Sequence, residues 1–213
     1  ILKVGVPIAV AVFMEGSLFT IAALAVGSLG TVPMAGHQVA LNFAALTFMI
    51  PLGLSMAVTV RVGNAVGRGD PEAVRFRAAV GVAMAMACQV GSASLMLLLP
   101  GRIAAIYTDN PAVAAVAVEL LLLAALFQLS DGLQVSCAGA LRGIKDTRLP
   151  MLLTAVSYWL VGLPVGWWLG FAAGLGARGV WMGLIAGLTT AAVLLAIRLR
   201  RISHRPGYWL TAV

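Results

Sequence analysis

The chain has 213 residues, of which 62% are hydrophobic and 10% are charged, and its mean hydropathy is +1.03. Soluble domains carry roughly 25% charged residues, so this composition excludes an ordinary water-soluble protein and indicates an integral membrane protein. The net charge is +7, from 14 basic and 7 acidic residues. The basic residues gather in short loops between apolar runs, without interleaved aromatic residues, and this excludes a nucleic-acid-binding protein.

Six apolar segments are long enough to cross a bilayer, which takes about 20 residues. We expect these spans at 4–29, 36–66, 73–99, 112–141, 149–173 and 178–198. Asp70-Pro71 and Asp109-Asn110-Pro111 have the residues typical of a helix N-cap followed by proline in the first turn. The predicted fold class is an all-α integral membrane protein, a single six-transmembrane-helix bundle over residues 1–213.

The last two spans contain glycines four residues apart, at 162, 166, 170 and 174 and at 179, 183 and 187. Small residues at this spacing let helix backbones approach closely in lipid. Pro51 and Pro164 each remove a backbone hydrogen bond, so we expect kinks in the second and fifth spans.

The basic residues also predict the orientation. Six spans place both ends of the chain on one side of the membrane. That side would carry twelve Lys and Arg residues, among them Lys3, Arg142 and Arg205, and the other side only Arg102 and Arg178. Because cytoplasmic loops are enriched in Lys and Arg, we expect both termini in the cytoplasm.

Two acids lie inside the spans, whereas the other five lie in loops or near helix ends, where caps and solvated positions account for them. Glu15 is central in the first span and Asp131 is well inside the fourth. Glu15 follows Lys3 by twelve residues, and Asp131 precedes Arg142 by eleven, which corresponds to about 18 Å and about 17 Å along a helix. The two acids therefore reach nearly the same depth on antiparallel helices.

A charge at the bilayer centre costs at least ~2.5–3.5 kcal/mol. We expect no basic side chain at the depth of the acids, so the carboxylates of Glu15 and Asp131 must be protonated or must hold a cation. Both options describe coupling ions. The alternative is a pair of protonated acids that only hydrogen-bond between helices.

A polar stripe on the fourth span supports a wet cavity, because Gln128, Asp131 and Gln134 follow one another at a spacing of three. Oxygen-rich surroundings without thiols suit Na⁺ or a proton better than a transition metal. Such stripes can also hold helices together without lining a cavity. Further polar side chains that could face the site are Gln38, Asn42, Thr154, Ser157 and Tyr158.

Other chemistry finds little support. The sequence contains no phosphate-binding loop of the GxxxxGK[ST] type, and His37 and His204 are too far apart for a metal site. Cys88 and Cys137 lie in apolar runs and indicate no disulfide framework. We expect no enzyme, and no cofactor besides a coupling ion.

Four stretches resemble the carboxyl-terminal half of multidrug and toxic compound extrusion (MATE) transporters of the NorM-like branch. They occur in the expected order and cover nearly the whole chain. The stretches are AGHQVALNFAALTFMIPLGLSMAVTVRVGNAVGRGD (35–70), IAAIYTDNPAV (103–113), LFQLSDGLQVSCAGALRGIKDTR (126–148) and SYWLVGLPVGWWLG (157–170).

The resemblance implies twelve helices in two six-helix lobes of a bacterial inner-membrane transporter, which exports cationic and amphipathic compounds in exchange for Na⁺ or H⁺. This chain would supply the C-terminal lobe, and an N-terminal six-helix lobe would be its partner. Glu15 within FMEGSLF and Asp131 within QLSDGLQ match the acids of the sodium-coupled branch. Several of those relatives have a tyrosine one turn before the aspartate, where this chain has Phe127. Either water would replace that cation ligand, or the coupling ion would be a proton.

The sequence therefore predicts the C-terminal lobe of a cation-coupled multidrug antiporter, with Na⁺ or H⁺ held by Glu15 and Asp131. Two alternatives stay open, a flippase of lipid-linked precursors on a related two-lobed fold and a structural membrane bundle without transport. The flippase would need several basic groups in its cavity for phosphate. A single lobe has nothing to alternate against, so we expect no transport by this chain alone.

Overall fold

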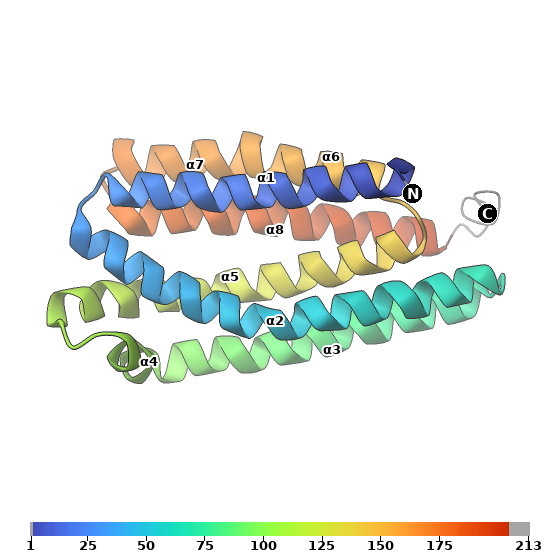
Figure 1. Ribbon diagram of the computed structural model, residues 1–213, viewed down its shortest axis with the longest axis horizontal. Coiled ribbons are helices and arrows are strands. Elements are labelled where there is room, and N and C mark those ends of the chain that lie inside the picture. Colours follow the sequence, from blue (N-terminus) through green and yellow to red (C-terminus); the bar gives the residue numbers. More distant parts are fainter. Residues whose placement is uncertain (1, 205–213) are drawn as a thin grey trace.

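The computed structural model describes residues 2–204, with the side chain of Lys3 set aside, and these residues form long helices that lie lengthwise against one another (Figure 1). The elements are α1 (Leu2–Gly27), α2 (Thr31–Gly67), α3 (Pro71–Leu98), α4 (Pro100–Tyr107), α5 (Pro111–Gly143), α6 (Arg148–Val156), the π-helical η1 (Ser157–Gly162), α7 (Leu163–Trp167), the π-helical η2 (Trp168–Ala172) and α8 (Gly176–Ser203).

Six helical segments of the described chain are long and apolar enough to cross a membrane, which confirms the predicted fold class. Five are α1, α2, α3, α5 and α8, and the sixth is the continuous run from α6 through η2, Arg148–Ala172. The outer surface is apolar, with Phe13, Leu46 and Phe76 each more than 60% exposed. Side chains of this kind belong in lipid rather than in water.

The region between the third and fourth predicted spans contains the short helix α4. Pro100 supplies a preset φ angle in the first turn,. Ile103 and Ala104 are then buried against the neighbouring helices. With eight residues, the segment is too short to be selected from the sequence as a membrane span,.

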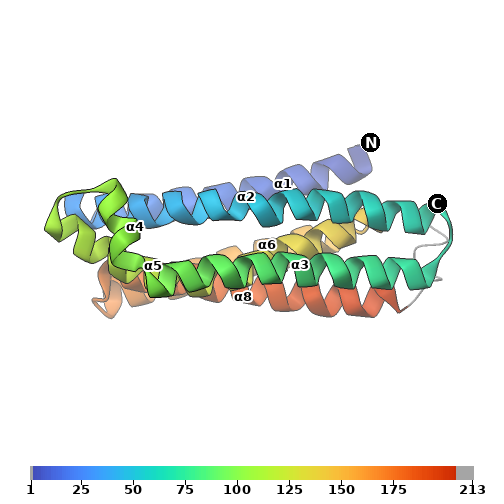
Figure 2. The ribbon, with the colours of Figure 1, turned by 90° about the horizontal axis from the view of Figure 1, so that it is seen from below.

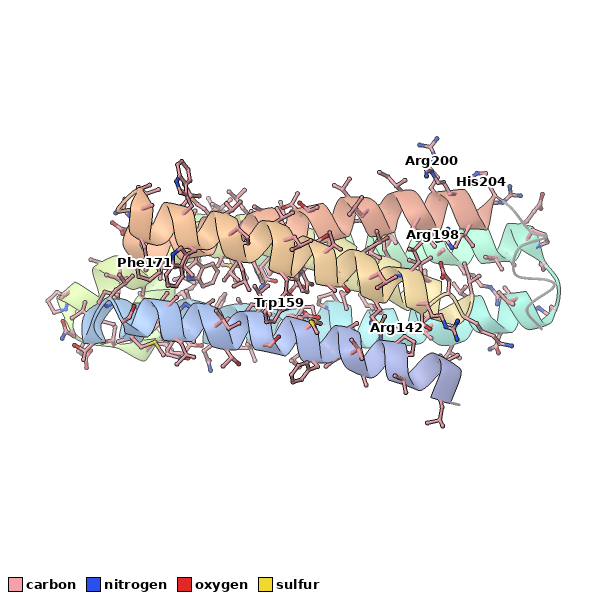
Figure 3. The ribbon with its side chains drawn as sticks, turned by 90° about the horizontal axis from the view of Figure 1, so that it is seen from above. Arg142, Trp159, Phe171, Arg198, Arg200 and His204 are labelled. Carbon is pink, nitrogen blue, oxygen red and sulfur yellow. The ribbon has the colours of Figure 1, made fainter. Side chains whose placement is uncertain are left out.

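The central helix of the bundle is α5, which packs against α2, α3 and α8. Helix α1 packs mainly against α6 (Figure 1). Helix α1 begins and α8 ends at the same end of the molecule, as six passes require (Figures 1 and 2). Arg142, Arg198 and Arg200 also lie at this end (Figure 3), and we call it the basic end.

The predicted helix starts are confirmed. The side chain of Asp70 accepts a hydrogen bond of 3.0 Å from the Ala73 backbone N–H at the start of α3. Asn110 does the same for Ala112 at the start of α5, also at 3.0 Å. Each cap satisfies a backbone donor that the first helical turn leaves without a partner.

The two proline-containing spans depart from a straight α-helix in different ways. π-Helical segments precede and follow Pro164, because the missing N–H interrupts the regular hydrogen-bond ladder,. Helix α2 continues through Pro51, and Figure 1 shows that it changes direction near its middle. The kink predicted at Pro51 is thus seen in α2, and in the fifth span the hydrogen bonding around Pro164 is irregular.

Glycine contacts join α8 to the fifth span. A Cβ atom built on Gly183 would lie 2.2 Å from the Cα of Gly166, and one on Gly187 would lie 2.9 Å from the Cα of Gly162. Only residues without a side chain fit at these crossings. The close helix approach predicted from the spacing of four is confirmed.

Candidate functional site

A small cavity of about 50 Å³ lies between α1, α5 and α6 in the half of the bundle toward the basic end. Glu15 of α1, Gln134 and Arg142 of α5, and Thr154 of α6 line it. The cavity has room for a few water molecules or one ion with part of its water shell. The first, fourth and fifth spans thus contribute polar groups to one space.

Asp131 lies one turn from Gln134 on α5, and its side chain is buried, with 5% exposed. Its carboxylate is close enough to that of Glu15 for the two charges to repel each other. Within residues 2–204 the Asp131 carboxylate forms no ion pair. The two acids that were selected by their depth therefore interact electrostatically, although Asp131 does not itself line the cavity of Glu15.

Neutral oxygen atoms surround the two acids. Tyr158, on η1, is fully buried, and its hydroxyl lies within the electrostatic range of both Glu15 and Asp131. The Tyr158 Oη is next to the Gln134 side chain. Among the described residues, however, neither Tyr158 Oη nor Gln134 Oε1 has a hydrogen-bond partner of ordinary geometry. Buried polar atoms without partners are costly, so this arrangement fits a bound water or cation between them.

The oxygen atoms around the two acids restrict which ion these residues suit. Two carboxylates, a phenol and an amide carbonyl are hard ligands, which favour a proton or an alkali cation. The described residues contain no group of three or more His, Cys, Asp or Glu side chains arranged for a metal ion. The assignment of Glu15 and Asp131 as Na⁺ ligands stays a prediction.

Arg142 corrects one expectation, because a basic side chain does share the space of the acids. Arg142 is partly buried, lines the cavity together with Glu15, and interacts electrostatically with it (Figure 3). Side chains of a helix tilt toward its N-terminus, and for α5 this direction leads from the basic end toward the bilayer interior. The number of residues along the helix predicted the depth of the Arg142 backbone, but it did not account for how far the side chain extends.

Asp146 was expected at a solvated helix end, and this expectation is wrong. Its side chain is 7% exposed, and the Nε of Arg198 donates a hydrogen bond of 2.9 Å to its Oδ2. Asp146 also lines the cavity of Glu15. At the other end of the bundle, Glu119 forms an ion pair with Arg178 in which both side chains are about half exposed.

Gln128 does not line the cavity, contrary to expectation. Its amide group donates to the Ala44 carbonyl and to the Thr47 hydroxyl of α2, and its Oε1 accepts a hydrogen bond of 2.7 Å from Gln89 of α3. Six residues of helix separate Gln128 from Gln134, which turns the two side chains about 120° apart. The stripe thus divides, and Gln128 joins α2, α3 and α5.

Phe127 also lies outside the cavity. Its ring is buried and makes edge-to-face contacts with Phe19, at a centroid distance of 5.9 Å, and with Trp181, at 5.8 Å. Trp181 in turn donates a hydrogen bond of 3.0 Å from Nε1 to Nδ1 of His37. Phe127 is therefore a core residue one turn from Asp131, and sequence reasoning missed the buried tryptophan–histidine pair.

The two polar residues of α2 nearer the opposite end are exposed. Asn42 Oδ1 accepts a hydrogen bond of 3.0 Å from the hydroxyl of Tyr107. Gln38 is exposed as well, and neither side chain lines the cavity of Glu15. Of the polar side chains expected to face the site, those of Gln134 and Thr154 line the cavity, and that of Tyr158 interacts electrostatically with the acids.

The helices, the buried Asp131 and the half-buried Glu15 define a multi-pass α-helical membrane protein with a polar site inside its bundle. The sequence profile of the family described as MatE matches residues 7–168. The chain belongs to the MATE family, as its motifs indicated.

Relatives agree with this assignment. The chain is 54% identical over 209 residues to the multidrug resistance protein PmpM of Pseudomonas aeruginosa, covering 96% of this chain and 44% of that protein. It is 53% identical over 205 residues to a probable multidrug resistance protein NorM of Xanthomonas axonopodis pv. citri, covering 96% and 45%. The chain thus spans about half the length of the curated relatives it matches.

Solved structures show the same fold. A MATE protein in a bent conformation superposes with a TM-score of 0.90 at 18% identity, covering 99% of this chain and 46% of that chain. A eukaryotic MATE transporter superposes with a TM-score of 0.88 at 21% identity, covering 96% and 47%. In each case this six-helix bundle corresponds to about half of the solved chain.

Proposed function

We propose that this chain is the C-terminal, ion-coupling lobe of a multidrug antiporter, and that Glu15 and Asp131 hold the coupling ion. The observation that carries the proposal is the Asp131 carboxylate, which is buried, is repelled by that of Glu15 and forms no ion pair in the described part of the chain. The multidrug resistance proteins that resemble this chain support the transport function.

Binding of one Na⁺ or H⁺ at the acids would relieve their repulsion and allow α1 and α5 to approach. A bound ion changes the balance between two conformations only through a difference in its affinity for them. The ion would bind in the conformation in which Glu15 and Asp131 are close and would be released when the helices separate. This is the alternating-access scheme of secondary transporters, in which organic cations leave as the coupling ion enters.

A second lobe would complete the transport path. We propose that a six-helix N-terminal lobe forms the other wall of the substrate cavity, and that the protein lies in the bacterial inner membrane with both ends of this chain in the cytoplasm. The excess of Lys and Arg at the basic end supports this orientation,.

The two alternatives are weaker. A flippase for lipid-linked precursors would be expected to place several basic groups in its cavity, whereas the cavity described above has Arg142 beside the acids Glu15 and Asp146. A structural bundle would have no reason to hold two adjacent carboxylates in lipid, because each costs insertion free energy.

Efflux measurements on the intact protein test the proposal. We expect Glu15→Gln and Asp131→Asn each to abolish efflux of an organic cation driven by an Na⁺ or H⁺ gradient, with normal membrane expression. The matched control is Glu119→Gln, which removes an acid from a half-exposed ion pair at the opposite end of the bundle and should leave efflux in place. Normal efflux in both site variants would refute the proposal.

A further inference from the structure

A second and larger cavity, independent of the buried acids, opens at the basic end of the bundle. It is a groove of about 510 Å³ between α3, α5 and α8. This volume falls in the range of about 300–1,000 Å³ typical of small-molecule sites. Its walls are mainly small apolar side chains, which leave a gap between α3 and α8: Ala79, Val82, Ala83, Leu133, Ala196 and Leu199.

The mouth of the groove is basic. Arg75 of α3 and Arg200 of α8 line it from opposite sides, and His204 lies beside Arg200 (Figure 3). Both arginines are exposed, and within residues 2–204 their guanidinium groups neither donate a hydrogen bond nor form an ion pair. Glu72 is one turn from Arg75 on α3 but does not line the groove. Two positive charges are therefore available to a ligand.

The groove is charged at its mouth and apolar along the rest of its length. Arg75 and Ala83 are eight residues apart on α3, so the apolar wall extends about 12 Å from the charged mouth toward the bilayer interior. A free anion would occupy only the mouth and leave these walls uncovered. A ligand that matches the whole groove carries a negative phosphate at one end and a hydrocarbon chain at the other.

We infer that the groove binds one acidic phospholipid from the leaflet at the basic end, with its phosphate held by Arg75 and Arg200 and an acyl chain along α3 and α8. Arginine pairs with phosphate through two parallel hydrogen bonds. A zwitterionic headgroup adds a positive charge that the two arginines repel, so a lipid with a net negative charge is favoured. Basic pockets between transmembrane helices at the cytoplasmic side bind acidic lipids in this manner.

Native mass spectrometry of the intact protein in detergent tests the inference, with titration of dioleoylphosphatidylglycerol, dioleoylphosphatidylcholine or inorganic phosphate. We expect one phosphatidylglycerol to be retained in preference to phosphatidylcholine. The double variant Arg75→Gln/Arg200→Gln should lower the affinity for phosphatidylglycerol about thirtyfold, the effect of two arginines at an acidic lipid surface. The charge-matched control is Arg68→Gln/Arg201→Gln, two exposed arginines of the same end that do not line the groove.

A steric pair tests the acyl-chain half of the site. Ala83→Phe should fill the groove and reduce lipid retention, whereas Ala87→Phe, an exposed position one turn farther along α3 and outside the groove, should not.

Equal retention of both lipids, retention unchanged in the double variant, competition by inorganic phosphate alone, or dimers in place of lipid adducts would overturn the inference. Neither arginine contacts the buried acids, so such a failure would leave the coupling proposal unaffected.

Discussion

The charge balance of the buried site depends on three side chains, the carboxylates of Glu15 and Asp131 and the guanidinium of Arg142. When both acids are ionised, the three groups carry one net negative charge. One monovalent cation then neutralises the site, which fits binding of a single Na⁺ or H⁺ per lobe. Arg142 would hold the Glu15 carboxylate in place of the ion and oppose its binding.

Replacement of Arg142 tests this balance at the residue scale. We expect Arg142→Gln to tighten cation binding by about tenfold, because it removes a repulsion of ~1–2 kcal/mol between the guanidinium and the incoming ion. The measurement is the Na⁺ concentration, or the pH, that gives half of the cation-dependent rise in Tm. The control is Arg148→Gln, an exposed arginine of the same end, and an unchanged midpoint in Arg142→Gln would contradict the assigned role.

The two acids could be selected from the sequence because a carboxylate within a long apolar run costs insertion free energy, and neither helix caps nor solvated helix ends account for it there. Their neighbours were harder to predict. Gln128 and Gln134 have the same spacing of three from Asp131, so the sequence does not distinguish them. The positions of α2 and α3 in the bundle determine that Gln128 accepts a hydrogen bond from Gln89 and does not face the cavity. Arg142 was missed because residue counting follows the backbone, whereas a long side chain extends well beyond it.

At the scale of the elements, glycine crossings set the distance between α8 and the fifth span. Gly183→Ala should lower the free energy of unfolding by about 1–3 kcal/mol, because the new methyl group meets the backbone of Gly166 and the helices must separate,. Gly91→Ala is the matched control, since a Cβ atom there meets nothing within 4 Å. Thermal unfolding in detergent checks the pair, and equal Tm values for the two variants would contradict this packing.

The ion pair of Asp146 and Arg198 connects the turn after α5 to α8. Removal of one partner of a buried pair costs about 3–5 kcal/mol, whereas an exposed pair contributes about 0–1 kcal/mol. Asp146→Ala should therefore destabilise the protein far more than Glu119→Ala, which breaks the half-exposed pair with Arg178. Denaturation curves of the two variants measure the difference, and similar losses would be inconsistent with the burial of Asp146.

Long apolar helices were predictable as elements because six spans of about 20 residues dominate the composition. The irregular elements were not. Helix α4 is too short to show a period, and the π-helical segments around Pro164 arise from hydrogen-bond rearrangement after the proline, which the sequence marks only as a kink,.

At the scale of the whole molecule, the chain corresponds to about half of its relatives and of the solved structures. Alternating access needs two bodies that move against each other around a site. We expect liposomes containing this chain alone to show no ion-driven transport of organic cations, and liposomes with both lobes to show it. Transport by the isolated chain at the rate of the two-lobed protein would contradict this view.

The central claim is that Glu15 and Asp131 together bind one coupling ion, and ion-dependent stability measures this most directly. The Tm of the wild-type protein should rise as Na⁺ is added at constant ionic strength, or as the pH is lowered at constant salt. Asp131→Asn and Glu15→Gln should each remove most of that rise, whereas Glu119→Gln should retain it. An ion-dependent rise in Tm that is the same in wild type and in both site variants would contradict the claim.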